Sequence, residues 1–372
     1  MLGTKSQIGE TSRESLPIQD IDYLEIYTGN AKQAAYYYSK LLGFRIVGFS
    51  GLETGDRDKI SYVLEQGGIR ILISGAYSTD HPISDFVKKH GDGVRDIAFQ
   101  VQDIEATYRK VVQNGGIPIR EPYSEEDEFG CLKKAVIGTF GATVHTFVER
   151  EEYKGIFAPG FHPIKQNSRA RNTGLTRFDH LAICVEDMNE WLQYYADIFG
   201  FGLLKVFKKE DISSKRSALM TKILQNGTER IKFSIIEPAV GKKKSQIREY
   251  LDYNNGAGVQ HIAFQTDNIL NSVKTLQRNG LNFLDTPETY YEMLHDRVGA
   301  LDEPVEELRK LRILADRDDE GYLLQIFGHP VNDRPTLFFE VIQRKGSKGF
   351  GNGNIRALFE AVEREQAKRG NL

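Results

Sequence analysis

The chain has 372 residues, enough for two domains that each bury a core. Charged residues make up 27% of it and the formal net charge is −3, so no basic field indicates a nucleic-acid partner. The two cysteines, Cys131 and Cys184, form no CxxC motif, which argues against a disulfide framework and favours a reducing cytoplasm. No apolar run approaches the roughly 18 residues of a membrane span.

In chain order, the polar residues 1–17 are expected to form a disordered leader. Residues 18–26 alternate as a strand does, and a helical stretch that ends in Leu-Gly-Phe follows them. Residues 91–100 predict a second strand, followed by a helix and an Asn-Gly turn, and residues 142–150 predict a third. These elements define an N-terminal domain over residues 18–157.

The second half of the chain repeats this plan. After a linker expected at residues 158–176, which is rich in Pro, Gly and polar residues, residues 177–372 form the C-terminal domain. Residues 256–265 match residues 91–100 closely, and both segments lead into a helix and an Asn-Gly turn. Self-similarity over this distance predicts two homologous domains built of strand–helix–strand–strand–strand units.

Three strand-like segments of the second half carry residues that bind metals. His180 and His261 each lie in the middle of a strand, and Glu340 lies inside the apolar segment 337–342. A strand histidine is often only a packed core residue, but a glutamate is rarely buried without a partner. Two imidazoles and one carboxylate form the facial triad that binds Fe(II) and leaves positions open.

The repeat is an internal control for this metal hypothesis. The aligned pairs are His180 with Tyr23, His261 with Asp96, and Glu340 with Thr146. The N-terminal copy keeps the apolar framework and lacks the ligand set. If the two histidines and the glutamate were only structural residues of the strands, all three would not be expected in the same copy. We therefore expect a metal site in the second domain and a structural role for the first.

Long segments of the chain resemble a known family. The paired modules resemble the vicinal oxygen chelate superfamily, and within it the chain is similar to 4-hydroxyphenylpyruvate dioxygenase and its sister hydroxymandelate synthase. The resemblance runs from about Ile18 to the C-terminus and is most specific in residues 256–266, 287–291, 321–327 and 338–372. It implies an α+β fold with two tandem domains of paired βαβββ modules, each forming an open, curved, barrel-like sheet.

The resemblance also implies a reaction and its partners. His180, His261 and Glu340 fall on the family's metal positions, so Fe(II) is the expected cofactor. A small aryl 2-oxo acid and O2 are the expected reactants, with oxidative decarboxylation followed by hydroxylation of the same molecule. No nucleic acid or membrane is expected as a partner, whereas a homo-oligomer, dimer or tetramer, is. The last helix, at about residues 354–368, is expected to cover the mouth of the site.

Further site residues follow by match to the family. The expected catalytic residues are Gln246, Gln260, Gln325, Phe338 and Phe350. Strand alternation points Gln260 away from His261, which leaves its contribution open. A structural hydrogen bond is an equal alternative for Gln325. Each phenylalanine, expected to sandwich the substrate ring, could instead be ordinary core.

The expected substrate-binding residues bear on the product. They are Thr221, Ser234, Ile236, Phe264, Asn354 and Ile355. Isoleucine replaces the dioxygenases' asparagine at Ile236 and their phenylalanine at Ile355, as in hydroxymandelate synthases. These changes favour 4-hydroxymandelate as the product, with homogentisate as the alternative. The flanking segments resemble the dioxygenases more closely, and a different aryl side chain would also account for Ile236.

Three other classes of protein are alternatives. An extradiol ring-cleaving dioxygenase would use the same iron ligands, but it needs an additional histidine as acid or base, and none lies within a matched strand of the second domain. A glyoxalase-type isomerase usually divides its ligands between modules. A metal-free binding protein would not be expected to carry the triad.

Overall fold

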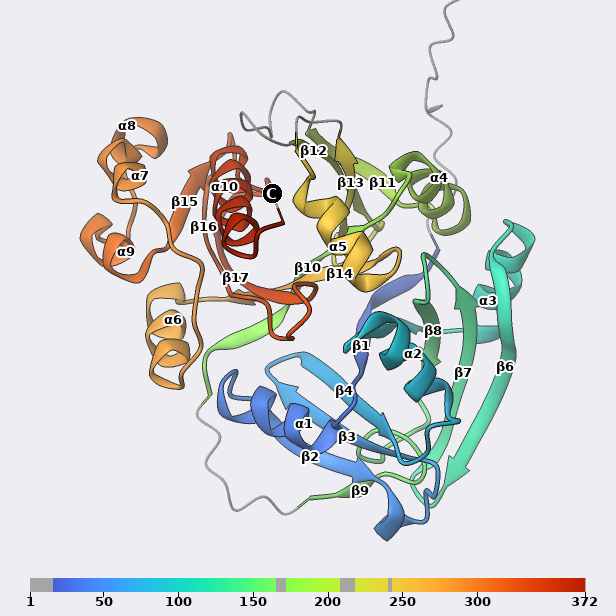
Figure 1. Cartoon of the computed structure of the whole chain (residues 1–372). Coiled ribbons are helices and arrows are strands. Elements are labelled where there is room, and N and C mark those ends of the chain that lie inside the picture. The colour runs from blue at the N-terminus through green and yellow to red at the C-terminus, as the bar shows by residue number, and fades with distance from the viewer. Residues whose placement is uncertain (1–15, 165–171, 208–217, 240–242, 372) are drawn as a thin grey trace, which may run out of the picture.

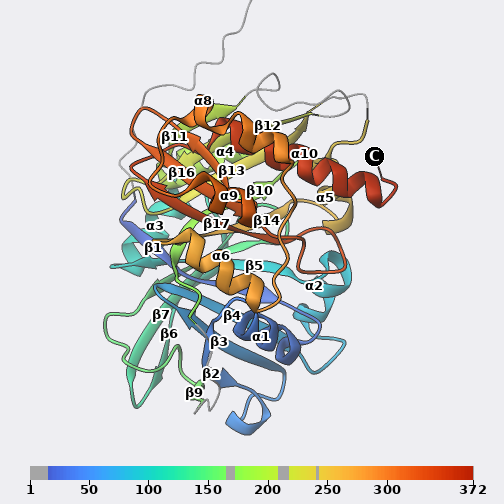
Figure 2. The same cartoon turned by 90° about the vertical axis from the view of Figure 1, so that its left-hand side faces the viewer.

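The computed structural model describes residues 16–164, 172–207, 218–239 and 243–371. Two large mixed sheets, one in each half of the chain, form two layers (Figures 1 and 2). The sheet of the N-terminal domain has the strand order β6-β7-β8-β5-β1-β4-β3-β2-β9, and that of the C-terminal domain β11-β12-β13-β10-β14-β17-β16-β15. Two curved sheets in tandem confirm the predicted fold class.

The N-terminal domain contains two βαβββ modules. The first consists of β1 (Ile18–Tyr27), α1 (Ala31–Lys40), β2 (Arg45–Ser50), the 3-10 turn η1 (Leu52–Thr54), β3 (Lys59–Gln66) and β4 (Ile69–Ala76). After α2 (Pro82–His90), the second consists of β5 (Gly93–Val101), α3 (Ile104–Gln113), β6 (Ile117–Asp127), β7 (Gly130–Gly138) and β8 (Val144–Glu149). The short strand β9 (His162–Pro163) then pairs with β2.

The C-terminal domain repeats the two modules with additions. The first consists of β10 (Leu175–Cys184), α4 (Met188–Phe199), β11 (Gly202–Phe207), β12 (Ala218–Gln225) and β13 (Lys232–Ala239). After α5 (Gln246–Asn254) come β14 (Gly258–Thr266), α6 (Ile269–Arg278), the inserted helices α7 (Glu288–Glu292), α8 (Leu294–Val298) and α9 (Val305–Leu311), then β15 (Leu314–Arg317), β16 (Tyr322–Phe327) and β17 (Phe338–Lys345). The chain ends in α10 (Asn352–Lys368).

The four module helices begin in the same way. Asn30, Asp103, Asp187 and Asn268 cap α1, α3, α4 and α6, and each side chain accepts a hydrogen bond from a backbone N–H of the first turn. Such a cap satisfies one of the otherwise unpaired N–H groups of a helix and stabilises it by about 1 kcal/mol. The shared cap shows that the duplication extends to local helix signals.

The segment boundaries differ from those expected. Leu16 is buried, so the chain joins the core before the expected end of the leader at residue 17; residues 1–15 lie outside the described part. The expected linker contributes β9 to the first sheet and the first two residues of β10 to the second, while its residues 165–171 are also outside the description. Backbone pairing therefore extends into sequence that composition alone predicts as linker.

One apolar core joins the two domains. It includes Phe44 of the first domain, whose ring lies 5.9 Å from that of Phe264, and Tyr38, whose ring lies 5.5 Å from that of Phe339. The outer faces of the two sheets and their module helices supply this core, which leaves the opposite faces free to line the barrels. Among the described helices, none has both the length and the hydropathy of a membrane span.

Candidate metal centre and pocket

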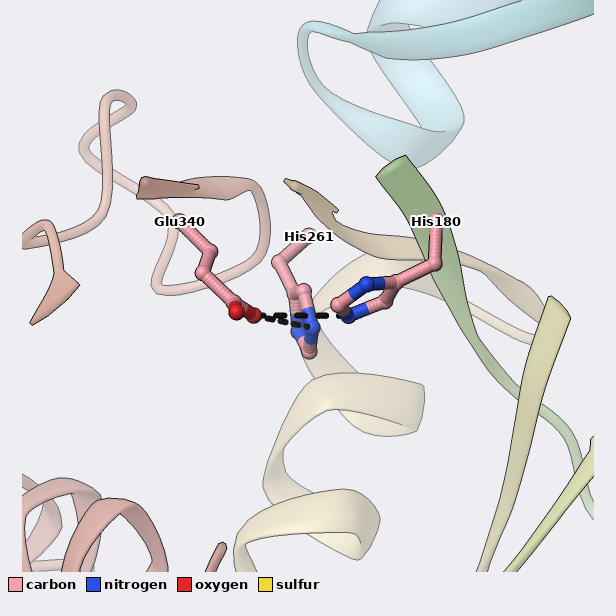
Figure 3. Close-up of side chains that lie close together, drawn as sticks. All are labelled: His180, His261 and Glu340. Carbon is pink, nitrogen blue, oxygen red and sulfur yellow. Dashed lines mark ion pairs between the residues drawn. The ribbon is translucent and has the colours of Figure 1, made fainter. Parts of the chain in front are cut away.

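The three expected ligands converge from neighbouring strands. His180 lies on β10, His261 on β14 and Glu340 on β17, which pair in that order in the sheet. The Nε2 atom of His180 lies 3.3 Å from Glu340 Oε2, and the Nε2 atom of His261 lies 3.5 Å from the same oxygen (Figure 3). The three potential ligand atoms all lie within 4.8 Å of one another, and all three side chains are buried.

Each of these side chains is held from behind by a hydrogen bond. Nδ1 of His180 lies 2.8 Å from Asp179 Oδ1, and Nδ1 of His261 lies 3.2 Å from Gln260 Oε1. Gln325 Nε2 donates to Glu340 Oε1 over 2.8 Å. These contacts occupy the atoms that face away from the centre. The Nε2 atoms of the two histidines and Oε2 of Glu340 are left to converge. The donor set fits a divalent transition metal with a facial triad.

The electrostatics of the site follow from burial and charge. Burial lowers the pKa of His180, but the carboxylates of Glu340 and Asp179 outweigh it and raise the value to about 8. Burial and the neighbouring charge of His180 hold the pKa of His261 well below its usual range. Burial raises the pKa of Asp179, yet the Arg344 guanidinium outweighs it and holds that pKa well below the ordinary value. A divalent cation at the centre would compensate these buried negative charges.

A mostly apolar pocket opens beside the three ligands. It is lined by His180, Leu219, Thr221, Ser234, Ile236, Gln246, Ile247, Gln260, His261, Gln325, Phe327, Phe338, Glu340, Phe350, Ile355, Leu358, Phe359 and Val362. Phe338 stacks on the His261 ring at 4.8 Å, and Phe350 meets the His180 ring edge-on at 4.8 Å. The pocket therefore combines aromatic walls with a few polar groups, as small-molecule sites do.

Helix α10 forms one wall of this pocket. Its residues Ile355, Leu358, Phe359 and Val362 face the cavity, and the helix packs against α5 and β15 (Figure 1). These four residues form an apolar stripe of α10 that lines the same cavity as the three candidate ligands.

Gln260 lines the pocket, contrary to the expectation from alternation. The pairing of β10 with β14 shifts register between His261 and Val259, which leaves Gln260 as the extra residue of a β-bulge. Because of this extra residue, the side chains of the two positions before His261 point to the faces opposite to those that alternation predicts. Gln260 therefore joins the ligand side, and Val259 joins the apolar core on the other face.

Two expected substrate contacts were wrong. Phe264 lies on the outer face of β14, with its ring 6.0 Å from Phe178, so it belongs to the interdomain core. Asn354 is fully buried behind the pocket wall, where it donates to Gln325 Oε1 over 2.9 Å and accepts from the Tyr290 hydroxyl over 2.6 Å. Asn354 therefore supports Gln325 and does not face the cavity.

Outside α10, three lining residues were not expected from the sequence. Leu219 lies two positions before Thr221 on β12, and Phe327 two positions after Gln325 on β16. Extending the alternation of each strand from its polar residue would have found both. Ile247 follows Gln246 at the start of α5, and no local pattern distinguishes it from other buried apolar residues.

The aligned positions of the N-terminal domain form a hydrogen-bond network. The Tyr23 hydroxyl donates to Asp96 Oδ2 over 3.2 Å, and the Thr146 hydroxyl donates to the same oxygen over 2.5 Å. The Thr146 backbone N–H donates to Asp96 Oδ1 over 3.0 Å. Their polar groups thus form hydrogen bonds with one another at the positions that carry the candidate ligands in the second domain.

The fold and the site define a class of protein. Residues 20–129 and 177–326 match the family model of the Glyoxalase/Bleomycin resistance protein/Dioxygenase superfamily. These two ranges cover most of both sheets. The chain is thus a two-domain member of that superfamily whose candidate ligands all lie in the second domain.

Individual relatives narrow the class. The chain is 43% identical to 4-hydroxyphenylpyruvate dioxygenase of Yarrowia lipolytica, with 94% of this chain and 93% of the relative covered. It is 41% identical to the Dictyostelium discoideum enzyme of the same name, with 95% and 100% covered. A solved triple mutant of 4-hydroxymandelate synthase from Streptomyces coelicolor superposes with a TM-score of 0.84 at 33% identity, covering 94% of this chain and all of that one.

The chain belongs to the 4-hydroxyphenylpyruvate dioxygenase family. It is therefore an enzyme, a dioxygenase of a 2-oxo acid. Both relatives match nearly the whole chain and carry the dioxygenase name. They favour 4-hydroxyphenylpyruvate dioxygenase, the alternative above, over the hydroxymandelate synthase expected from the pocket isoleucines.

Proposed function

We propose that this protein is an Fe(II)-dependent 4-hydroxyphenylpyruvate dioxygenase that forms homogentisate. The observation that carries the proposal is the convergence of His180 Nε2, His261 Nε2 and Glu340 Oε2 beside an aromatic pocket. Relatives of this name above 40% identity over nearly the whole chain support the substrate and the product. His180, His261 and Glu340 would hold the iron, which supplies dioxygen activation and oxidative decarboxylation when bound.

The pocket residues then have distinct tasks. Phe338 and Phe350 flank the two histidines and offer ring faces to an aromatic substrate. Thr221 and Ser234, whose hydroxyl oxygens lie 2.9 Å apart, offer hydrogen bonds to a polar substituent on the pocket wall. Gln246 and Gln260 supply amide groups on the same cavity. The stripe of α10 excludes water, which strengthens every polar contact inside.

A second candidate product rests on a separate observation. Ile236 and Ile355 both line the cavity, where the dioxygenase pattern carries an amide and a ring. Isoleucine at both positions is the feature shared with hydroxymandelate synthases, and one such enzyme superposes closely. A difference of roughly 1–3 kcal/mol in substrate pose is enough to choose between ring and benzylic attack.

The test is a product analysis. Purified protein loaded with Fe(II) is incubated with 4-hydroxyphenylpyruvate and O2, and the products are identified by mass and retention time. Homogentisate with CO2 release is the expected result. Predominant 4-hydroxymandelate would favour the second candidate, and absence of substrate-dependent O2 uptake would contradict both. A homo-oligomeric state and a cytoplasmic location remain predictions.

A further inference from the structure

A buried carboxylate–guanidinium pair lies directly behind His180. Asp179 Oδ1 accepts hydrogen bonds from His180 Nδ1 and from Arg344 Nη2, each over 2.8 Å. Asp179 Oδ2 accepts from Arg344 Nε over 2.7 Å. The side chains of Asp179 and Arg344 are 1% and 9% exposed, so solvent does not screen the pair.

The same arginine reaches the segment that leads into α10. Its Nη1 atom donates to the carbonyl oxygen of Gly349 over 2.6 Å. Its guanidinium lies 5.3 Å from the centre of the Phe350 ring, the ring that also contacts His180. Asp179 and Phe350 therefore both contact His180, and Arg344 contacts both of them; we call these three residues the His180 frame.

The N-terminal domain contains a matching frame without metal ligands. Arg150 binds Asp22 through Nε over 2.8 Å and Nη2 over 2.7 Å, and its guanidinium lies 5.0 Å from the Phe157 ring. Phe157 meets the Tyr23 ring edge-on at 5.1 Å and 70°, as Phe350 meets His180 at 4.8 Å and 66°. The frame is thus a property of the duplicated module, although Asp22 has a second arginine beside it, Arg70, at 3.6 Å.

The backbone reason for the frame is a bulge shared by the two copies. The pairing of β1 with β5 shifts register between Ile21 and Tyr23, and that of β10 with β14 shifts between Phe178 and His180. Asp22 and Asp179 are the extra residues. A bulge lets two consecutive side chains approach one another, which a regular strand would place on opposite faces.

We propose that Asp179 and Arg344 are positioning residues for metal binding, acting through His180. This inference rests on the proposed metal centre and deepens it. By accepting the Nδ1–H of His180, Asp179 fixes the tautomer whose Nε2 lone pair faces Glu340 and makes that nitrogen a stronger donor. Arg344 holds the carboxylate in place with two parallel hydrogen bonds and compensates its buried charge.

The two histidines are held unequally as a result. His261 has only the neutral amide of Gln260 behind it, at 3.2 Å, whereas His180 has a charged carboxylate at 2.8 Å. Charge-assisted hydrogen bonds are roughly twice as strong as neutral ones. His180 is therefore the imidazole whose donor strength the protein raises most.

The experiment compares Asp179→Asn with its matched control Asp22→Asn in the full-length, metal-free protein. Each substitution removes one carboxylate from an equivalent Asp–Arg pair, but only the first pair contacts a candidate ligand. Co(II) and, anaerobically, Fe(II) are titrated, with the Co(II) visible spectrum and the dissociation constant as readouts. We expect Asp179→Asn to weaken binding about 10–100-fold and to change the spectrum, while Asp22→Asn keeps the parent affinity.

Further variants separate the possible failures. Arg344→Lys and Arg150→Lys keep the charge and remove the paired hydrogen bonds, and they serve if an aspartate variant does not fold. We expect the first to weaken metal binding and the second to lower only thermal stability. The positioning role would be overturned if Asp179→Asn bound metal as tightly as Asp22→Asn, and Arg344→Lys as tightly as Arg150→Lys. Parent-like metal affinity of His180→Ala would instead contradict the metal centre itself.

Discussion

Gln325 and Glu340 form a hydrogen bond of 2.8 Å between an amide nitrogen and the carboxylate oxygen that faces away from the two histidines. Gln325 Oε1 in turn accepts from Asn354, the third residue of α10. The carboxylate at the centre is therefore connected through two side chains to the helix that walls the pocket. A substitution of Gln325 therefore tests how much the orientation of the Glu340 carboxylate contributes to turnover.

We predict that Gln325→Leu lowers kcat/KM about 10–100-fold. The substitution leaves Glu340 Oε1 without its donor and removes the contact to Asn354, and a hydrogen bond to a charged group contributes about 1.5–3 kcal/mol. Gln343→Leu on β17 is the control, because Gln343 is also buried but bonds Ile269 N and Glu303 away from the pocket. Equal losses of kcat/KM in the two variants would indicate general destabilisation.

Removal of any one candidate ligand should abolish metal binding and turnover. His180→Ala, His261→Ala and Glu340→Ala each leave two donors, too few for a facial triad. Metal content and O2 uptake are the measurements, and circular dichroism verifies the fold. Thr146→Ala, at the position of Glu340 in the first domain, should bind metal as the parent does. Normal turnover in a ligand variant would remove that residue from the site.

The pocket isoleucines should control the partition between products. Ile355→Phe adds a ring to the cavity wall near Phe350 and is expected to raise the ratio of homogentisate to 4-hydroxymandelate. Both products are quantified by mass spectrometry, since even a minor product reports the partition. The reference is Ile355→Leu, which conserves volume without adding a ring. Identical ratios in both variants and the parent would count against a role for this wall.

The stability of the protein should depend on pH through Asp96. Burial raises the pKa of this carboxyl to about 7, outweighing the hydrogen bonds from Thr146 and Tyr23. A raised pKa favours the protonated folded state, so this stabilisation is complete below about pH 4 and is lost as the pH rises through 7, by roughly 4 kcal/mol in total.

Denaturant unfolding at several pH values measures this contribution. Asp96→Asn cannot titrate, so its unfolding free energy should fall less than that of the parent between pH 5 and pH 8. Asp80→Asn, at an exposed position, should follow the parent curve. Parallel curves for all three proteins would show that Asp96 titrates normally.

The convergence of the three candidate ligands could be predicted from the sequence because the chain contains its own comparison. His180, His261 and Glu340 align with Tyr23, Asp96 and Thr146, which do not form such a ligand set, so their coincidence in one copy is informative. Thr221 and Ile236, expected from the match to the family, both line the cavity, and the strands that carry them, β12 and β13, pair in regular register. The module plan follows from strand and helix periodicity, which depends on neighbouring residues only.

The errors arise where a strand departs from regular pairing, or where a side chain packs against a distant part of the chain. Gln260 was placed on the wrong face because a bulge carries no sequence pattern of its own. Phe264 was assigned to the pocket although alternation from His261 already placed it on the other face, where it packs against Phe44. The contact of Asp179 with Arg344 joins residues 165 positions apart, and only tertiary structure reveals it.

The matching frame in the N-terminal domain has a consequence for engineering. Three side chains, Tyr23, Asp96 and Thr146, occupy the positions that carry the candidate ligands in the second domain, and Asp22 and Arg150 already stand behind the first of them. Imidazoles in place of Tyr23 and Asp96 and a carboxylate in place of Thr146 would reproduce the donor set at the aligned positions of the first domain. Three substitutions would thus give the N-terminal domain the ligand set for a second metal ion.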